Sequence, residues 1–347
     1  MIKVNINDAI GKTLAHDLSR FVEGVADRTP LRKGHIIQKE DIALLLAMGK
    51  ENLFVMEEGK VVNSAKIHEE EAAHRLAAIC RNTGIVEAAV KEGKIELFAD
   101  IDGLFRVNVE RQKKINSIEG VIIATRTSLF PVHKGDKLAA VKTVPLEIDD
   151  HLLCEAEAIA DNNPVLELLP YKLKSAGVVI TGSEVQKGIT KDAFAPLLVE
   201  KLKIFGIQIT KKIITGDGAE NIANSIAEVR STKPDIILCT GGMSVDPDDN
   251  TPGAIIQSGA KPVCYGTPLL PGSMMMLAYF EDALPIMGVP GGALYKKNRA
   301  GILDIVLPRL AAGIKMTKED FIAMGNGGLC LDCPICNYPV CTYGKAV

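Results

Sequence analysis

A short apolar run followed directly by two glycines most limits the folds open to this chain. Residues 236–239 read Ile, Ile, Leu, Cys and lead into Thr240, Gly241 and Gly242. A short apolar run bounded by turn residues is typical of a buried strand in a parallel sheet. Ligands of open α/β sheets bind at the carboxyl ends of such strands, where adjacent glycines let backbone N–H groups approach an anion. The pattern therefore predicts a ligand site at the end of this strand.

Two more apolar runs end in the same way. Residues 178–180 lead into a Thr-Gly pair, and the alternating run 207–213 leads into a Thr-Gly-Asp sequence. Helical spacing of apolar residues predicts helices over 192–206 and 222–229. Strands that alternate with helices through short connections indicate a doubly wound α/β domain. Its strand ends would bring three carboxylates to one edge of the sheet: Glu184, Asp217 and Asp249.

From about residue 175 to residue 313 the chain resembles the molybdenum cofactor biosynthesis domain, in particular the version found in molybdopterin molybdotransferases. Six sequence elements of that family occur here in the family's order. The matching residues are Thr181, Gly182 and Glu184; Asp192; Asp217; Gly241, Gly242, Ser244 and Asp249; Pro271 and Gly272; Pro290 and Gly291. The resemblance implies a three-layer molybdopterin-binding domain over residues 175–315.

The chain also departs from the family pattern. Ser183 stands where the family has Asp, and Phe194 stands where it has Asn. In the family's Lys-Pro-Gly-Lys-Pro turn, Leu270, Ser273 and Met274 replace both lysines and the second proline. Lysines are natural partners of oxyanions and phosphates, so their loss argues against the metal-inserting step itself.

The resemblance implies a pterin dithiolene phosphate, molybdopterin or its adenylylated form, lying across the strand ends. Backbone amides at Gly241, Gly242 and Ser244 would hold the phosphate. Mg²⁺ would be placed for phosphoryl or adenylyl chemistry by the carboxylates of Glu184, Asp217 and Asp249, the predicted catalytic residues. In the family the cofactor is adenylylated and then receives its metal, so ATP, AMP and molybdate are the further ligands to expect.

Two classes of function stay open. The first is a transferase of molybdenum cofactor synthesis, molybdotransferase-like or adenylyltransferase-like. The second is a non-catalytic molybdopterin carrier that delivers the cofactor to a molybdoenzyme or a cofactor-synthesis partner. The retained carboxylates favour the enzyme, and the lost lysines favour the carrier. The resemblance also implies a homodimer, because the family's sites lie partly between subunits.

The last residues form a second informative pattern. Half of the chain's eight cysteines, Cys330, Cys333, Cys336 and Cys341, fall within twelve residues. This spacing can bring four thiolates around one centre, either Zn²⁺ or an iron–sulfur cluster. Free or redox-active thiols are the third alternative. The other four cysteines follow apolar residues, which favours buried thiols in a reducing compartment: Cys80, Cys154, Cys239 and Cys264.

Composition excludes several classes of partner. The formal net charge is −3 and the pI is about 6.1, and no long basic run occurs, so a nucleic-acid partner is not expected. No stretch approaches the roughly 20 consecutive apolar residues of a membrane span, and the amino terminus lacks an apolar signal core. We therefore expect a soluble, cytoplasmic protein.

The 347 residues are expected to divide into an α/β domain and smaller modules. The predicted ranges are a small α+β module at 1–62, a β-rich module at 63–150, a connecting segment at 151–174, the α/β domain at 175–315 and a Cys-rich tail at 316–347. Within the first two modules, helices are expected near 39–48 and 64–81.

Some residues carry a simpler interpretation. Asp246, Asp248 and Asp249 share one loop, and the register of the family match leaves open which of them is functional. Met274, Met275 and Met276 are expected to pack in an apolar setting. The six histidines show no metal-ligand spacing.

Overall fold

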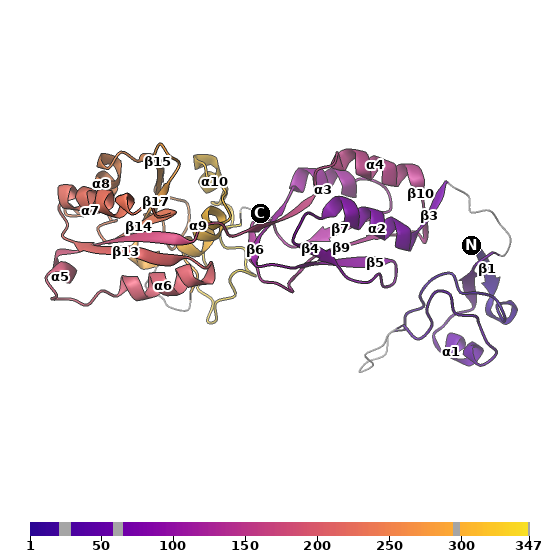
Figure 1. Cartoon of the computed structure of the whole chain (residues 1–347). Helices are drawn as coiled ribbons and strands as arrows, with labels where there is room; N and C mark the ends of the chain where they lie inside the picture. The colour runs from indigo at the N-terminus through magenta and orange to yellow at the C-terminus, as the bar shows by residue number, and fades with distance from the viewer. Residues whose placement is uncertain (21–28, 58–64, 294–298, 346–347) are drawn as a thin grey trace. The chain divides into compact units, whose positions relative to one another are not determined.

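The computed structural model describes residues 1–20, 29–57, 65–293 and 299–345 (Figure 1). They form two compact units, and each is described here by itself. The first unit comprises residues 1–101, 105–128 and 133–168, and the second comprises residues 102–104, 129–132 and Leu169–Val347.

Residues 1–20 and 29–57 build a small α+β module. Its elements are β1 (Ile2–Asn5), the 3₁₀ helix η1 (Ile6–Asp8), α1 (Asp41–Ala47) and β2 (Asn52–Val55), with β1 and β2 antiparallel. The helix expected near 39–48 is confirmed as α1. A buried apolar cluster holds the module together and includes Ile6, Leu14, Ile37, Leu45 and Val55. The expected boundary between residues 62 and 63 lies outside the described residues.

The remainder of the first unit combines antiparallel strands with three helices. Its elements are β3 (Lys66–His68), α2 (Glu69–Cys80), β4 (Ile85–Glu87), β5 (Lys94–Ala99), most of β6 (Gly103–Val107), α3 (Val109–Asn116), β7 (Val121–Thr125), β9 (Lys137–Thr143), β10 (Glu147–Asp149) and α4 (Asp150–Ala160). A four-stranded sheet has the order β4-β5-β9-β7, and β10 pairs with β3. Strands β6 and β11 (Leu166–Pro170) have residues in both units, and β8 (Phe130–Val132) belongs to the second unit. These three strands form a sheet with the order β11-β6-β8.

Two expectations for this region were wrong in detail. The helix expected from residue 64 begins at Glu69, because Lys66–His68 form β3 and the His68 side chain accepts a hydrogen bond from the Glu70 N–H group. The segment 151–174, expected to be a connection, contains most of α4 and all of β11. Apolar residues at helical spacing explain α4, since Leu153, Ala156 and Ala160 are buried.

The second unit contains a six-stranded mixed sheet. Its strands are β12 (Ser175–Thr181), β13 (Gln208–Thr215), β14 (Ile236–Thr240), β15 (Lys261–Tyr265), β16 (Met276–Tyr279) and β17 (Pro285–Val289). The order across the sheet is β13-β12-β14-β17-β16-β15. The first four strands are parallel, and β16 pairs antiparallel with both β15 and β17. The predicted doubly wound α/β fold is confirmed.

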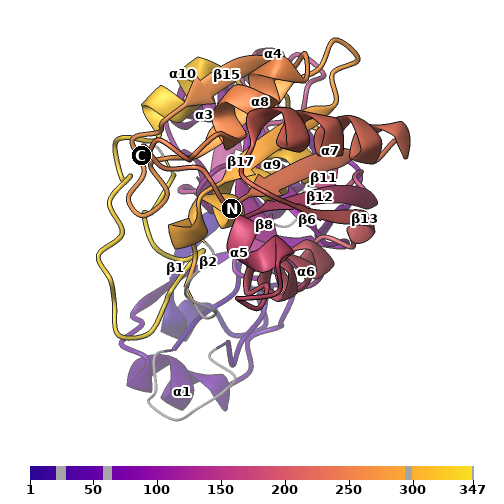
Figure 2. The ribbon, with the colours of Figure 1, turned by 90° about the vertical axis from the view of Figure 1, so that its left-hand side faces the viewer.

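Helices cover both faces of this sheet (Figures 1 and 2). One face carries α6 (Phe194–Ile204) and α9 (Ile302–Ala311), and the other carries α7 (Ala219–Ser231) and α8 (Thr251–Gln257). Side chains of β12 alternate between the two cores: Val178 and Ile180 belong to one cluster and Val179 to the other. Because both faces are buried, the strand reads as a continuous apolar run. The result is a three-layer domain.

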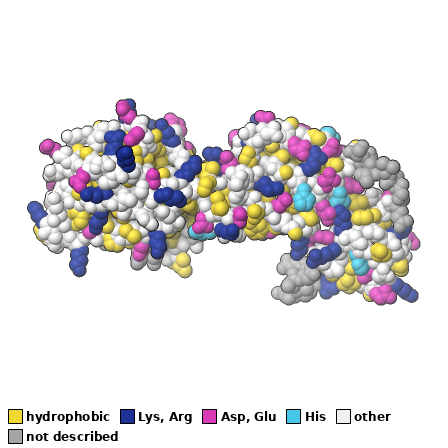
Figure 3. Space-filling view, viewed as in Figure 1, with side chains coloured by type: hydrophobic (Ala, Val, Ile, Leu, Met, Phe, Trp, Pro, Cys, Tyr) yellow, Lys and Arg dark blue, Asp and Glu magenta, His cyan; other side chains and the backbone are white. Residues whose placement is uncertain are grey.

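Figure 3 shows Lys and Arg side chains interspersed with Asp and Glu over the face in view. Within the described ranges, no helix has both the length and the apolar character needed to cross a membrane.

Cys80 and Cys239 are buried as expected, and burial raises the pKa of each thiol to about 12. Cys264 is partly buried, whereas Cys154 is exposed and corrects the expectation of a buried thiol.

Gly177 lets α7 pack directly on β12. A Cβ atom at this position would lie 2.0 Å from Cγ1 of Val229. We therefore expect Gly177→Ala to lower the free energy of unfolding by about 1–3 kcal/mol, because overpacking forces neighbouring groups to shift. Urea unfolding measures the change. Gly253→Ala is the matched control, since its Cβ would meet nothing within 4 Å; equal stability of the two variants would contradict the packing assignment.

Candidate functional site

The strand order reverses between β12 and β14. The chain leaves β12 for β13 on one side and then returns to β14 on the other side of β12. Such a switch point opens a crevice outside the carboxyl ends of the strands, which is where ligands of open α/β sheets bind. Thr181 ends β12 and Thr240 ends β14 at this place.

Two glycines give the crevice its shape. Gly241 has φ +93°, and a Cβ atom there would lie 2.2 Å from the carbonyl oxygen of Thr181. Gly242 has φ +54°, and its Cβ would lie 2.9 Å from Oγ1 of Thr251. Only glycine satisfies both the positive φ and the close approach at Gly241. The end of β14 therefore lies directly against the end of β12.

Buried hydroxyl groups hold these backbone segments. Thr251 Oγ1 donates to the carbonyl oxygen of Gly241 at 2.8 Å and lies 3.3 Å from Oγ1 of Thr181. The Thr251 N–H group donates to the Gly242 carbonyl at 3.1 Å. In the described part of the chain, Oγ1 of buried Thr240 has no hydrogen-bond partner. Thr251 fixes both glycine carbonyls, and sequence reasoning missed it because nothing near it in the chain reveals this contact.

Asp217 and Ser183 bind each other at the ends of β13 and β12. The Ser183 N–H group donates to Asp217 Oδ2 at 2.9 Å, and the Asp217 N–H group donates to Ser183 Oγ at 3.4 Å. The serine that replaces the family's Asp thus contacts one of the predicted catalytic carboxylates. Glu184 begins the short helix α5 (Ser183–Gln186) with that serine, and its carboxylate folds back over Gly182, whose Cβ would lie 3.1 Å from Oε1.

The aspartates in the loop after β14 differ in their exposure. Asp246 and Asp248 are exposed, whereas Asp249 is half-buried. The position of a Cβ on Gly242 lies 3.6 Å from Oδ1 of Asp249. The next residue, Asn250, donates from Nδ2 to the carbonyl oxygen of Asp217 at 2.9 Å. Asp249 is therefore the acidic residue of this loop that is turned towards the glycines.

Tyr265, the last residue of β15, binds this loop, and no sequence pattern pointed to it. Its hydroxyl donates to the carbonyl oxygens of Met243 at 3.4 Å and Ser244 at 3.3 Å. Burial, together with the nearby charge of Asp249, raises the pKa of the Tyr265 phenol. The side chain of Ser244 is exposed.

The Asp192 carboxylate binds the start of α6. Its Oδ1 accepts hydrogen bonds from the N–H groups of Phe194 at 3.0 Å and Ala195 at 2.9 Å, and its Oδ2 pairs with Lys212 Nζ at 3.3 Å. It thus caps the first turn of α6. Phe194, in place of the family's Asn, lies on Gly291, whose Cβ would be 3.1 Å from the ring.

The Pro-Gly elements lie at the same edge of the sheet. Pro290 is buried at the end of β17, and Gly291 starts the 3₁₀ helix η2 (Gly291–Ala293). Because β16 runs antiparallel to β17, Met276 at its start pairs with Gly288 near the end of β17. Pro271 and Gly272 precede β16 and therefore approach this edge as well. Gly272 has φ +113°, and its Cβ would lie 2.7 Å from Ile302 at the start of α9.

Possible metal ligands are distributed in two places. Glu184, Asp217 and Asp249 lie at the strand ends, while the four tail cysteines line one cavity of about 50 Å³. Among the described side chains, no three His, Cys, Asp or Glu residues stand close enough to hold one metal ion. The structure thus groups each predicted set without forming a complete ligand shell.

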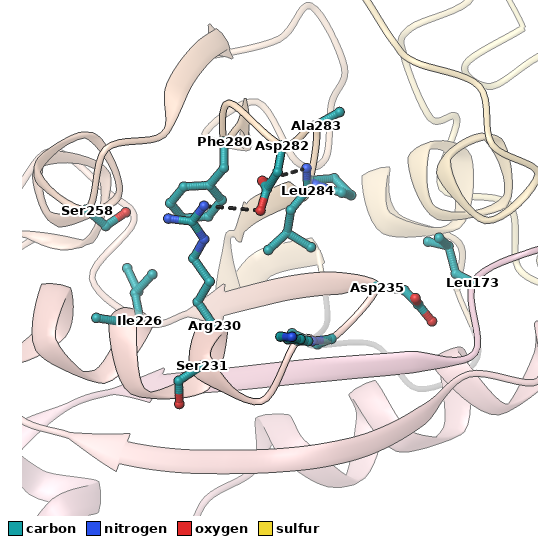
Figure 4. Close-up of a pocket in the computed structure, with 14 residues that line it drawn as sticks. Leu173, Ile226, Arg230, Ser231, Asp235, Ser258, Phe280, Asp282, Ala283 and Leu284 are labelled. Atoms are coloured by element: carbon teal, nitrogen blue, oxygen red, sulfur yellow. Dashed lines mark hydrogen bonds and ion pairs between the residues drawn. The ribbon is translucent and has the colours of Figure 1, made fainter.

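A larger cavity of about 800 Å³ lies at the opposite, amino-terminal edge of the sheet (Figure 4). Arg230 stacks on the ring of Phe280 with its guanidinium 4.1 Å from the ring centroid, and it pairs with Asp282 at 3.1 Å. Asp235 accepts hydrogen bonds from both N–H groups of Lys174 and Ser175, at 2.7 and 2.8 Å. None of the predicted site residues lines this cavity.

Comparison with known proteins supports the resemblance seen in the sequence. Residues 177–320 match a family model described as a probable molybdopterin binding domain, and residues 3–57 match one described as a domain of unknown function. The α/β domain is thereby confirmed as a member of the molybdenum cofactor biosynthesis domain family, and pterin binding is the property that this family suggests.

Individual relatives match over short regions. The chain is 33% identical over 88 residues to a CinA-like protein of Thermotoga neapolitana, covering 25% of this chain and 21% of that protein. It is 30% identical over 86 residues to a CinA-like protein of Desulfosudis oleivorans, covering 25% and 21%. The matched region thus spans about one fifth of these relatives. The tungsten cofactor synthesizing protein MoaB of Pyrococcus furiosus superposes with a TM-score of 0.35 at 18% identity, covering 42% of this chain and 98% of that chain.

Thr251→Val tests the hydroxyl contact that holds the glycines. Valine has nearly the same shape but cannot donate to the Gly241 carbonyl, so we expect the free energy of unfolding to fall by about 1–3 kcal/mol. Chemical denaturation measures it. Thr251→Ser keeps the hydroxyl and should recover most of the loss, whereas a serine variant as unstable as the valine variant would rule out the hydrogen bond as the cause.

Asp235 gives a prediction for the dependence of stability on pH. Burial raises the pKa of its carboxyl, but hydrogen bonds from Lys174 and Ser175 outweigh this and hold the pKa below its ordinary value. A lowered folded-state pKa stabilises the fold above the ordinary value, and this stabilisation disappears as the pH falls through the folded-state pKa.

We therefore expect Asp235→Ala to lower the free energy of unfolding by about 1–2 kcal/mol at neutral pH, a range that allows for screening of the carboxylate by solvent. The gap to the unmodified protein should narrow as the pH falls below about 4. Denaturation curves at several pH values measure this, with Asp246→Ala, at an exposed aspartate, as the control. A gap that stays constant down to the acid limit would contradict the assignment.

Proposed function

Since residues 177–320 belong to the molybdenum cofactor biosynthesis domain family, we propose that the crevice between β12 and β14 binds molybdopterin or its adenylylated form. The observation that carries the proposal is the contact of Gly241 with Thr181 at the switch point of the sheet, where a Cβ would lie 2.2 Å from the carbonyl oxygen. At Gly241 and Gly242 the chain therefore offers backbone groups with no side chain of their own to the crevice.

The orientation of the glycine peptides supports an anion at this floor. The carbonyls of Gly241 and Gly242 both accept hydrogen bonds from Thr251. In a trans peptide the N–H group points opposite to the carbonyl. The N–H groups that follow these carbonyls, those of Gly242 and Met243, therefore point away from Thr251 and are suited to a phosphate of the pterin. Ser244 adds an exposed hydroxyl at the same loop.

Asp217 and Asp249 are the carboxylates best placed for chemistry on that phosphate. Asn250 joins the two loops by its bond to the Asp217 carbonyl, and Asp249 faces Gly242. Mg²⁺ is usually held by one or two carboxylates together with substrate phosphates. The two aspartates fit that mode, in which the ion arrives with the nucleotide and neutralises phosphate charge. Glu184, folded over Gly182, is the third carboxylate of the proposed catalytic set.

The reaction we propose is a transfer step of cofactor synthesis. An adenylyltransferase-like activity would use ATP, and a molybdotransferase-like activity would use molybdate and release AMP. Leu270, Ser273 and Met274 offer no cation to molybdate, so the site is better suited to adenylyl or phosphoryl chemistry than to metal insertion. A homodimer and a cytoplasmic location belong to the same proposal.

A molybdopterin carrier is the second candidate. The hydrogen bond from the Ser183 N–H group to Asp217 Oδ2, at 2.9 Å, favours it, because this bond occupies one oxygen of a carboxylate that an enzyme would use. A carrier keeps the crevice and the glycine peptides but needs no carboxylate for turnover. It would pass molybdopterin unchanged to a molybdoenzyme or a synthesis partner.

Asp217→Asn separates the two candidates. The amide oxygen can still accept the Ser183 N–H bond, so the local fold should persist while the negative charge is lost. For an enzyme we expect turnover with molybdopterin, ATP and Mg²⁺ to fall by about 10²-fold or more, with pterin affinity changed less than about threefold.

Product analysis by chromatography and a parallel binding titration supply both values. Asp246→Asn, in the exposed part of the neighbouring loop, is the charge-matched control and should retain turnover. Unmodified protein that binds the pterin and converts none of it would support the carrier. Turnover unaffected by Asp217→Asn would contradict the catalytic role of this carboxylate.

A further inference from the structure

The cysteines of the carboxyl-terminal segment, residues 328–345, surround a single cavity. Cys330, Cys333, Cys336 and Cys341 all line it, and its volume is about 50 Å³. All four are free thiols of intermediate exposure. Residues separated by up to eleven positions in the chain thus meet at one place. As they stand, the thiols surround the cavity and do not converge into a complete ligand set.

The middle of this segment has little packing of its own. Residues 330–345 contain no helix or strand. Leu331, Ile335 and Val340 are 77%, 80% and 80% exposed. Tyr338 and Tyr343 anchor the later part of the segment on the core, but residues 331–337 bury little apolar surface, and a short stretch of this kind usually depends on a crosslink or a structural metal for a defined conformation. The four thiols are the groups in this segment that could supply one.

Cations lie beneath and beside the segment. Arg309 on α9 is 5% exposed, and its Nη2 donates to the Gly344 carbonyl at 3.0 Å. Within the described residues, its Nε has no hydrogen-bond partner. Arg299 lines the cavity and pairs with Asp332. A buried cation is costly without a counter-charge, and a metal bound by four thiolates carries net negative charge.

Both ends of the segment bind the turn at residues 270–272. The Cys330 N–H group donates to the Leu270 carbonyl at 2.8 Å, and the Leu270 N–H group donates to the Gly328 carbonyl at 2.9 Å. Tyr343 donates from its hydroxyl to the Pro271 carbonyl at 2.6 Å. The segment therefore holds the turn in which the family has its lysines.

We propose that Cys330, Cys333, Cys336 and Cys341 bind one thiophilic metal centre, a single Zn²⁺ or an iron–sulfur cluster, which fixes the 270–272 turn. Rotation of cysteine side chains and a shift of the unpacked segment bring the four sulfurs inward to the metal. The centre supplies negative charge beside Arg299, which lines the cavity, and the crosslink that the segment lacks. Neither the metal site nor its hold on the turn rests on the proposed function.

Metal analysis of the full chain tests the first part. Protein purified without oxygen is assayed for zinc, iron and acid-labile sulfide, and the absorption spectrum is recorded. About one centre per chain is expected. Zinc alone identifies a single ion, and iron with equivalent sulfide identifies a cluster; either result supports the shared thiolate chemistry. No metal in the purified protein, and none retained after incubation with Zn²⁺ or with Fe²⁺ and sulfide, overturns it, as does a disulfide among the four.

A double variant and a matched control assign the ligands. Cys333→Ser with Cys336→Ser changes residues in the unpacked middle of the segment and should lower metal content at least about tenfold. Cys154→Ser removes an exposed thiol elsewhere in the chain and should leave it unchanged. Circular dichroism verifies that the double variant folds. A folded double variant with full metal content would overturn the assignment.

Hydrogen exchange tests the link to the turn. Metal removal by a chelator should speed exchange at the amides of Leu270 and Cys330, whose bonds join the segment to the turn, while peptides from β14 exchange as before. Unchanged exchange at both amides would overturn the link. Because neither readout uses a pterin, a protein that binds metal and protects the turn but binds no molybdopterin would refute the proposed function and leave this inference intact.

Discussion

The contact between Gly241 and the carbonyl of Thr181 is the constraint on which the candidate site depends. It brings the ends of β14 and β12 together at the switch point, and a Cβ at Gly241 would lie only 2.2 Å from that oxygen. Thr251 then fixes both glycine carbonyls, so the following N–H groups face the other way. A crevice floor made of fixed backbone, with carboxylates on the flanking loops, follows from this one close approach.

Much of the fold could be predicted because burial on both faces of a strand leaves a continuous apolar run in the sequence. The runs at 178–180 and 236–239 became central strands for this reason. The role of the glycines at the strand ends could also be predicted, because their backbone conformations exclude other residues. Thr251, Tyr265 and Asn250 could not be predicted as site residues, because each acts through a contact with a segment that only the tertiary fold brings near.

Strand pairing and helix capping explain why some predicted element ends differ from those in the structure. The helix expected from residue 64 starts five residues later, at Glu69, because β3 pairs with β10 more than 75 residues away in the chain. In the site, Asp192 accepts hydrogen bonds from the first turn of α6 and pairs with Lys212, a capping role that the helix pattern predicted. The 270–274 turn lacks the family's lysines. Instead, the cysteine segment binds this turn directly.

Calorimetric titration with molybdopterin and with adenylylated molybdopterin, each with and without Mg²⁺, tests the central claim most directly. The account predicts saturable binding of at least one form, stronger with Mg²⁺ where the ligand carries the nucleotide phosphates, and abolished by Gly241→Val in protein that remains folded. Binding of neither form by folded protein would contradict the assignment of the β12–β14 crevice as a molybdopterin site.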